Sequence, residues 1–160
     1  MNITGLDHIY LTVSDFGVSE RFYDDVMEAL GFRKGDSPIG GDPHAHYIRP
    51  TLQISIRPAK NISAKYDAYS PGLHHLCLQA ASNSDIDEAY EKLIALGIEV
   101  TAPALYPEYH PEYYATFFED PDGLRLEVVA RTPQRDIIAN RWDEMRVFLN
   151  PVKELLSRRN

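Results

Sequence analysis

The sequence predicts an α+β fold in which one β-α-β-β-β unit occurs twice, and three observations support this. Residues 7–13 (DHIYLTV) match residues 74–80 (HHLCLQA) at an offset of 67, and residues 29–32 (ALGF) match residues 95–98 (ALGI) at an offset of 66. Both opening segments alternate apolar and polar residues, which is the period of a half-buried strand. After each segment, apolar residues recur at helical spacing and end at a glycine suited to a left-handed cap. Self-similarity of this kind indicates duplicated modules.

The first unit begins with the expected strand at 7–13, and a helix follows it. The apolar stripe of that helix is formed by Val18, Phe22, Val26 and Leu30. Ser14 or Asp15 is placed to cap its first turn, because short polar side chains accept hydrogen bonds from the free N–H groups there. Further strands are expected at 32–35, 46–49 and 52–57.

The second unit repeats this order, with a strand at 74–80 and a helix that Asp85 is placed to cap. The apolar stripe of this helix is formed by Ile86, Tyr90 and Leu93. Further strands are expected at 99–102, 114–119 and 124–130. The last two strands form a hairpin, because Asp120-Pro121-Asp122-Gly123 between them has strong turn chemistry.

The chain therefore divides into one duplicated domain and a C-terminal extension. We expect the domain over residues 1–131, with module one at about 4–60 and module two at about 71–131, and the extension over 132–160. A helical stripe in the extension is formed by Ile138, Trp142, Met145 and Leu149, and Asn150-Pro151 ends it. We interpret this extension as a docking arm for its own fold or for a neighbouring subunit.

Composition excludes several classes of function. The 160 residues are 44% hydrophobic and 25% charged, which is typical of a globular domain. Sixteen Lys and Arg against 24 Asp and Glu give a net charge of −8, so we expect neither nucleic acid nor an anionic membrane as a partner. No apolar run reaches the ~18 residues of a membrane helix. A single cysteine and a start without a signal-like segment predict a cytoplasmic protein.

The polar faces of the expected strands carry side chains that are typical of metal ligands. His8, His75 and Glu127 occupy polar-face positions of the two related units. Strand parity selects His75 over His74, because His75 aligns with His8 and its neighbour points elsewhere. Two histidines and one carboxylate hold a divalent metal and leave coordination positions open, which suits Fe(II) and also Mn, Co, Ni or Zn.

The segments DHIYLTV, GLHHLCLQA and ATFFEDPDGLRLEVV, in this order and spacing, resemble the vicinal oxygen chelate superfamily. That superfamily includes glyoxalase I, bleomycin-resistance proteins, fosfomycin-resistance enzymes, methylmalonyl-CoA epimerase and extradiol dioxygenases. The resemblance covers about residues 4–131. It implies paired βαβββ modules forming a cupped, barrel-like mixed sheet with the helices outside. It also implies one divalent metal, with His8, His75 and Glu127 as ligands.

The fourth ligand position of the family falls on Gln53 if residues 52–54 are aligned with residues 126–128. A slip of two residues puts Ser55 there instead. A glyoxalase I-like enzyme would carry a glutamate at this position as both ligand and base, whereas neither Gln53 nor Ser55 takes a proton. The ligand pattern His, Gln, His, Glu is similar to that of the epimerase. The pattern His, His, Glu with open coordination positions is similar to that of extradiol dioxygenases and fosfomycin enzymes.

Other residues are candidates for the surroundings of the metal. The Tyr- and Pro-rich connection 103–114 offers His110, Tyr113 and Tyr114 as acid/base or hydrogen-bonding groups, unless it is an ordinary surface loop. The candidate substrate pocket comprises Tyr10, His46, Ser55, Arg57 and Cys77. Arg57 either presents positive charge to an anionic substrate or pairs with a surface carboxylate, and Cys77 is also a plausible apolar filler. His44 is expected to be exposed to solvent.

These observations predict a divalent-metal-dependent enzyme, either a dioxygenase or a glyoxalase-type lyase or isomerase. Its small substrate would chelate the metal through vicinal oxygens, and the metal would act as a Lewis acid. The alternative is a non-catalytic small-molecule binding or sequestering protein of the bleomycin-resistance type. The expected assembly is a homodimer, and the resemblance permits a cleft built between its chains.

Overall fold

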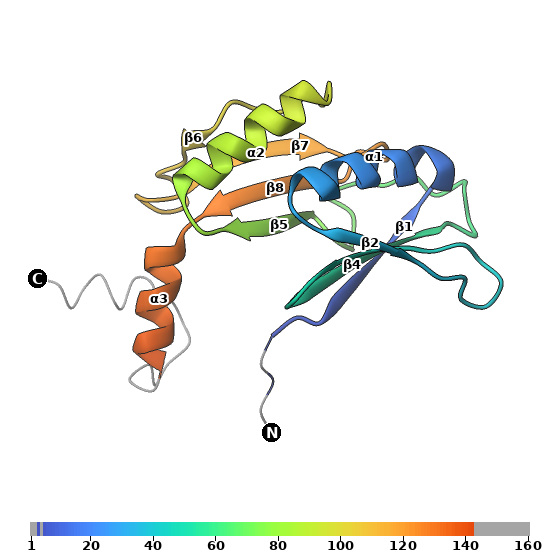
Figure 1. Ribbon diagram of the computed structural model, residues 1–160, viewed down its shortest axis with the longest axis horizontal. Coiled ribbons are helices and arrows are strands. Elements are labelled where there is room, and N and C mark those ends of the chain that lie inside the picture. The colour runs from blue at the N-terminus through green and yellow to red at the C-terminus, as the bar shows by residue number, and fades with distance from the viewer. Residues whose placement is uncertain (1–2, 4, 143–160) are drawn as a thin grey trace, which may run out of the picture.

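The computed structural model describes residues 3 and 5–142, and these form two β-α-β-β-β modules followed by a helix (Figure 1). Module one consists of β1 (His8–Val13), α1 (Phe16–Ala29), β2 (Arg33–Asp36), β3 (Ala45–Arg49) and β4 (Leu52–Pro58). Module two consists of β5 (His75–Ala80), α2 (Asn83–Ala95), β6 (Ala104–Leu105), β7 (Tyr114–Glu119) and β8 (Arg125–Ala130). The last helix is α3 (Thr132–Asn140). The α+β class and the paired modules predicted from the sequence are confirmed.

Each module carries its own four-stranded mixed sheet, and the order of strands is the same in both. The orders are β1-β4-β3-β2 and β5-β8-β7-β6. The first strand of each module pairs in parallel with the last, and the remaining pairs are antiparallel. Within the described ranges the two sheets do not pair with each other, so they do not close into a barrel in one chain.

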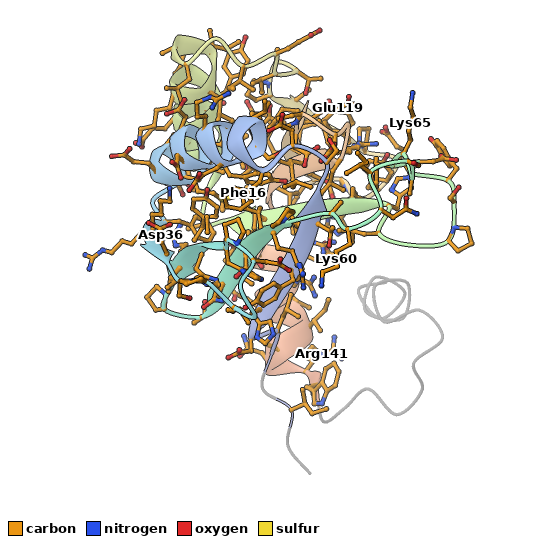
Figure 2. The ribbon with its side chains drawn as sticks, turned by 90° about the vertical axis from the view of Figure 1, so that its right-hand side faces the viewer. Phe16, Asp36, Lys60, Lys65, Glu119 and Arg141 are labelled. Carbon is orange, nitrogen blue, oxygen red and sulfur yellow. The ribbon has the colours of Figure 1, made fainter. Side chains whose placement is uncertain are left out.

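The helices α1 and α2 lie together on one side of the two sheets, whereas α3 projects from the other side (Figures 1 and 2). One hydrophobic core runs under both helices and includes Val13, Val26 and Ile54 of module one and Leu93 and Val128 of module two. Strand alternation puts Val13, Ile54 and Val128 on the helix side, which leaves the opposite side for the polar set. Among the described residues, no helix is both long enough and apolar enough to cross a bilayer.

The turn between β7 and β8 connects the modules through two of its carboxylates. Ser14, at the end of β1, donates its backbone N–H to Asp122 Oδ2 at 2.8 Å and its hydroxyl to Asp122 Oδ1. The buried Tyr23 hydroxyl of α1 donates to Asp120 Oδ2 at 2.8 Å. This turn therefore fixes part of the relative placement of the two modules.

Three local expectations differ from the structure. Residues 99–102 do not form a strand: Val100 makes an isolated bridge to Phe118, and the strand lies at Ala104–Leu105. Pro103 separates the two pairings, because it has no N–H to donate to a sheet. The N-cap of α2 is Ser82, and Asp85 is the N3 residue that completes its capping box.

The third difference concerns His44, which was expected to be exposed and is 4% exposed. Its Nδ1 is 2.9 Å from the Asp42 carbonyl oxygen, and its ring stacks on that of His46. In the extension, α3 ends before Trp142, and Met145, Leu149 and the expected break at Asn150-Pro151 lie outside the described residues.

Candidate metal centre

The side of each sheet opposite the helices carries the polar residues predicted from strand parity. In β1, Leu11 and Val13 are buried toward the helices, whereas His8 and Tyr10 are exposed on the other side. In β8, Leu126 and Val128 belong to the main core, and Glu127 lies on the opposite side. The two polar faces are therefore the places where the candidate ligands lie.

Module two brings His75 and Glu127 together. His75 Nε2 is 3.6 Å from Glu127 Oε2, and the Glu127 side chain is only 3% exposed. Neighbouring donor atoms on one metal ion, each about 2.0–2.2 Å from it, are separated by roughly 3 to 3.5 Å. An imidazole nitrogen and a carboxylate oxygen are also donors that Fe, Mn, Co, Ni and Zn accept. This pair therefore fits half of a divalent-metal site.

Tyr113 contacts the same carboxylate from the connection between β6 and β7. Its hydroxyl donates to Glu127 Oε1 at 2.5 Å. Burial, and then the hydrogen bond to Glu127, raises the pKa of Tyr113 above its ordinary value. The phenol consequently keeps its proton at neutral pH and acts here as a donor.

Cys77 lies opposite Glu127 in the β5–β8 ladder and is partly buried. Burial, followed by the charge of Glu127, raises the pKa of the Cys77 thiol to about 12. A thiol that keeps its proton is a poor nucleophile and a poor ligand. Cys77 packs with Ala115, Phe117 and Val129, which agrees with the apolar-filler alternative.

The connection that carries Tyr113 forms an aromatic cover on this face. Tyr106 contacts Phe117 edge-on at 5.1 Å between ring centroids and stacks on Tyr109 at 6.2 Å. Tyr109 in turn contacts Tyr113 at 5.2 Å. Arg131 lies over the Tyr113 ring at 5.7 Å. The Tyr-rich connection therefore packs beside Glu127 as a set of rings in mutual contact.

Module one presents a second group of polar side chains around Tyr10. The Tyr10 ring contacts the rings of His8, His44 and His46 edge-on, at centroid distances of 5.4, 5.9 and 6.2 Å. His8 Nδ1 is 2.8 Å from Asp7 Oδ2. The predicted pocket residues Tyr10 and His46 thus share a face with the predicted ligand His8.

A chain of hydrogen bonds links His46 to Gln53 through Ser55. Ser55 Oγ is 2.8 Å from His46 Nδ1 and accepts from Gln53 Nε2 at 2.9 Å. His46 Nε2 is 2.9 Å from Ser37 Oγ. Ser55 is completely buried and His46 is 8% exposed, so the chain is largely shielded from water.

The pairing of the strands shows where Gln53 and Ser55, the two candidates for the fourth ligand position, lie relative to His8. Gln53 lies opposite His8 and Ser55 lies opposite Tyr10. In module two, Glu127 lies opposite Cys77, two positions beyond His75. With His8 and His75 equivalent, Ser55 is the counterpart of Glu127. Its hydroxyl is nevertheless used by Gln53 and His46, and Gln53 is the longer side chain on that face.

Other predicted site residues lie away from these groups. Arg57 donates to Asp42 Oδ2 at 2.7 Å. Of the two roles considered for Arg57, this contact agrees with pairing to a carboxylate. The Tyr114 hydroxyl donates to Asp87 on α2 at 2.7 Å, on the helix side of the sheet. His110 Nδ1 accepts from the Glu112 backbone N–H at 3.2 Å. Tyr113 is therefore the member of this trio that contacts a predicted ligand.

A single chain keeps the two groups apart. Across residues 3 and 5–142, no three His, Cys, Asp or Glu side chains come together in a group that would hold a metal ion. His8 therefore does not join His75 and Glu127 within one chain. The candidate centre consists of two half-sites on separate modules.

Sequence reasoning missed several partners of the predicted ligands. Asp7 and His74, which precede His8 and His75, each contact the ring of the following histidine. Ser37 and Arg131 also contact site residues. For Asp7 and His74 the available signal was the repeat itself, because both modules place a polar residue directly before the histidine.

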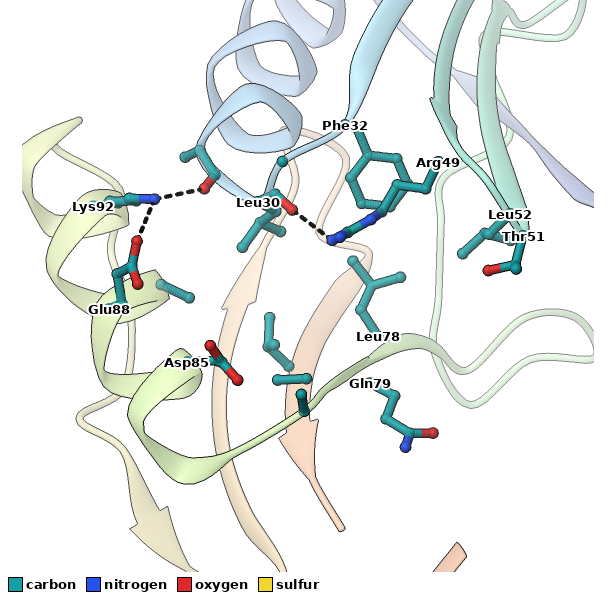
Figure 3. Close-up of a pocket in the computed structure, with 16 residues that line it drawn as sticks. Leu30, Phe32, Arg49, Thr51, Leu52, Leu78, Gln79, Asp85, Glu88 and Lys92 are labelled. Atoms are coloured by element: carbon teal, nitrogen blue, oxygen red, sulfur yellow. Dashed lines mark hydrogen bonds and ion pairs between the residues drawn. The ribbon is translucent and has the colours of Figure 1, made fainter. Parts of the chain in front are cut away.

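A pocket of about 600 Å³ lies elsewhere, on the helix side between the modules (Figure 3). The Arg49 guanidinium donates to the Leu30 carbonyl oxygen at 3.0 Å, and Lys92 Nζ donates to the Ala29 carbonyl oxygen at 3.5 Å. Both cations therefore satisfy carbonyls at the end of α1. None of the candidate metal ligands lines this pocket.

Comparisons with known proteins agree with this architecture. A model of the glyoxalase/bleomycin resistance protein/dioxygenase superfamily matches residues 5–128. YqjT of Bacillus subtilis (strain 168), an uncharacterized protein, is 33% identical over 132 residues, which cover 78% of this chain and 98% of YqjT. The metallothiol transferase FosB of Lysinibacillus sphaericus (strain C3-41) is 25% identical over 134 residues, which cover 84% of this chain and 87% of FosB.

Solved structures show the same fold. A glyoxylase/bleomycin resistance protein/dioxygenase domain from Frankia sp. EAN1pec superimposes with a TM-score of 0.66 at 26% identity, covering 81% of this chain and 98% of that domain. The fosfomycin resistance protein FosX from Listeria monocytogenes superimposes with a TM-score of 0.59 at 22% identity, covering 83% of this chain and 98% of FosX. The paired modules, their polar faces and the family match together show that this chain belongs to the glyoxalase/bleomycin resistance protein/dioxygenase superfamily, the vicinal oxygen chelate superfamily.

Proposed function

We propose that this protein is a divalent-metal-dependent enzyme that acts on a small molecule with two adjacent oxygen atoms. The observation that carries the proposal is the 3.6 Å approach of His75 Nε2 to the buried Glu127 Oε2. A carboxylate that is 3% exposed is costly to bury without a cation or hydrogen-bond donors. Tyr113 supplies a donor to Oε1, and Oε2 faces an imidazole nitrogen that also suits a metal.

The complete site, in this proposal, contains two copies of the chain. His8 and Gln53 of one copy would complete the half-site formed by His75 and Glu127 of the other. Support comes from the separation of the half-sites within one chain and from the exposure of His8, whose side chain is 52% accessible. A C2 dimer that joins the two polar faces would form two equivalent sites.

The donor set favours an anionic substrate. Two imidazoles, one amide and one carboxylate contain a single negative charge, so a bound divalent cation leaves a net positive site. Such a metal supplies Lewis-acid stabilisation to charge that develops on a coordinated oxygen. Tyr113 donates its hydroxyl proton to Glu127 Oε1 and would thereby orient this carboxylate toward the metal.

The residue at the fourth position narrows the reaction class. Neither Gln53 nor Ser55 is a base, so a reaction that needs a metal-bound glutamate base in module one is disfavoured. Ring opening of a catechol-like substrate, lyase or isomerase chemistry, and addition to a metal-bound substrate remain compatible. The similarity to a metallothiol transferase supports a metal-dependent reaction within this set.

Metal content tests the proposal directly. After anaerobic reconstitution with Fe, Mn, Co, Ni or Zn, the wild-type protein should retain metal, and His8→Ala, His75→Ala and Glu127→Gln should each retain at least about 10-fold less. Glu91→Gln is the charge-matched control, because Glu91 is exposed on α2 and remote from the polar faces. Wild-type metal content in all three variants would refute the proposed site.

Activity is measured on the same reconstituted samples with catechols, hemithioacetals and acyl thioesters. We expect turnover of one substrate class that disappears with the metal. Saturable binding without turnover, at any metal, would instead support the non-catalytic sequestering function.

A further inference from the structure

The candidate ligands share a hydrogen-bond pattern in which one polar atom is held and the other is left free. His8 Nδ1 lies 2.8 Å from Asp7 Oδ2, and His75 Nδ1 lies 2.7 Å from His74 Nδ1. In both histidines the partner is the preceding residue and the held atom is Nδ1. Among residues 3 and 5–142, Nε2 of each histidine makes no hydrogen bond, so Nε2 is the atom left free in both modules.

The two oxygen-bearing candidates follow the same pattern. Tyr113 holds Glu127 Oε1, which leaves Oε2 beside His75 Nε2. Ser55 Oγ accepts from the Gln53 amide nitrogen, and the amide oxygen has no hydrogen-bond partner among the residues that the structure describes. In all four side chains, the free atom is one that a divalent metal accepts, namely an imidazole nitrogen, a carboxylate oxygen or an amide oxygen.

The partner of Gln53, Ser55, belongs to a buried network of hydrogen bonds. The Gln53 amide nitrogen lies 2.9 Å from Ser55 Oγ and 3.4 Å from His46 Nδ1. Because the Gln53 NH2 group is directed at both Ser55 Oγ and His46 Nδ1, it favours the His46 tautomer in which Nδ1 carries no proton. The His46 Nε2–H then donates to Ser37 Oγ. Because Ser55 is fully buried, each of these groups needs its partner, and the amide orientation is coupled to the whole chain.

We propose that Asp7, Ser55, His74 and Tyr113 are positioning residues, each of which selects the atom that its neighbouring ligand presents to the metal. The donor set is then Nε2 of His8 and His75, Oε1 of Gln53 and Oε2 of Glu127. Ser55, although it is the counterpart of Glu127 by register, orients the ligand and does not bind the metal itself. This inference rests on the proposed metal site.

The physical reason for such partners is that a loose ligand loses rotamer entropy when it binds a metal, whereas a held ligand has already lost it. An amide that turned around would present an NH2 group, which is not a metal donor. Removing a partner should therefore weaken metal binding and change the coordination geometry without removing any ligand.

The test is titration of the full-length protein with Co²⁺ alone, followed by its visible absorption spectrum. Ser55→Ala and Asp7→Ala should each weaken Co²⁺ binding by about 10-fold, within the range typical of residues that orient metal ligands, and should change the ligand-field bands. Ser19→Ala is the control for Ser55→Ala, because Ser19 is also buried and its hydroxyl has no hydrogen-bond partner among the described residues. Asp25→Ala, an exposed change on α1, is the control for Asp7→Ala.

Tight Co²⁺ binding by the wild type and both controls, with weakened binding and altered spectra for the two test variants, would support the inference. Wild-type affinity and spectra in folded Ser55→Ala and Asp7→Ala proteins would overturn it and leave the proposed metal site standing. No Co²⁺ binding by the wild type would overturn both. Asp7 is 96% exposed, so Asp7→Ala keeps the test decisive even if Ser55→Ala fails to fold.

Discussion

Asp120 is a buried carboxyl group through which a turn of module two contacts a helix of module one. It is 6% exposed and accepts from the Tyr23 hydroxyl and the backbone N–H groups of Asp122 and Leu124. Burial raises the pKa of Asp120, and these hydrogen bonds oppose the rise without cancelling it. Folded protein therefore binds this proton more tightly than the unfolded chain does.

The Asp120 contact predicts a pH-dependent effect of Tyr23→Phe. Because the folded-state pKa is raised, this group's contribution to stability is fully present below about pH 4 and is lost as the pH rises through the folded-state pKa. Removing the Tyr23 hydroxyl raises that pKa further, so we expect a loss of about 1–3 kcal/mol in unfolding free energy at pH 7 and a smaller loss near pH 3.

Urea unfolding of the wild type and Tyr23→Phe at both pH values measures this difference. Tyr90→Phe is the control, because Tyr90 also lies on a helix and its hydroxyl has no hydrogen-bond partner among the described residues. An equal loss at pH 7 and pH 3 would contradict the assignment to Asp120.

The sequence alone predicts on which face of its strand each candidate ligand lies. Strand parity placed His8, His75 and Glu127 on the polar faces, because successive side chains of a strand point to opposite sides. It did not show which atom of each side chain is free, since that depends on neighbours such as Asp7 and Tyr113 and on their rotamers. The burial of His44 was missed for the same reason.

Among the elements, α2 illustrates how a helix start is fixed by two side chains. Ser82 accepts from the Asp85 N–H at 3.3 Å, while Asp85 Oδ2 accepts from the Ser82 N–H at 2.8 Å. These reciprocal bonds satisfy two of the N–H groups that a helix leaves without partners.

We expect Ser82→Ala to lower the unfolding free energy by about 1 kcal/mol, because it removes the N-cap. Ser84→Ala is the matched control: Ser84 lies two residues later, and within the described part of the chain its hydroxyl hydrogen-bonds to Ser82 Oγ alone. Thermal or urea unfolding of both variants makes the comparison. Equal stability of the two variants would show that the capping box contributes nothing measurable.

The strands and helices were largely predictable from local pattern, whereas the segment before β7 was not. Periodicity placed β1, α1, β4, β5, α2 and β8 close to their observed positions. The stretch 99–105 carries no clear alternation, and Pro103 within it interrupts pairing. Tertiary contacts with β7, such as the bond from the Thr101 N–H to the Phe117 carbonyl oxygen at 2.9 Å, decide its conformation.

For the whole molecule, the main feature is that the two half-sites lie on separate sheets. A repeat in sequence shows that His8 and His75 are equivalent, but it does not show how one module sits against the other. That placement depends on contacts such as those of Ser14 and Tyr23 with the turn at 120–123. The separation of His8 from His75 and Glu127 was therefore beyond sequence reasoning.

A site shared between two copies predicts complementation of metal binding. His8→Ala and Glu127→Gln chains, unfolded and refolded as an equal mixture, should regain about a quarter of the wild-type metal sites, because half of the dimers are mixed and each holds one intact site. Elemental analysis after gel filtration measures the metal in the dimer fraction.

The matched control is a mixture of His75→Ala and Glu127→Gln chains. Both changes lie in the same half-site, so no mixed dimer has an intact site and no metal should return. Failure of the first mixture to exceed the second would mean that the metal site is not shared between copies.

The independence of the two sheets also has a consequence for how new specificities arise. Each module carries its own half of the polar face, and residues 59–74 join the modules without contributing a strand. Recombination within this connection would exchange one half-site as a unit and leave the hydrogen-bond partners of the other intact. A family built in this way can vary the two halves of a cleft separately, by shuffling modules as well as by point mutation.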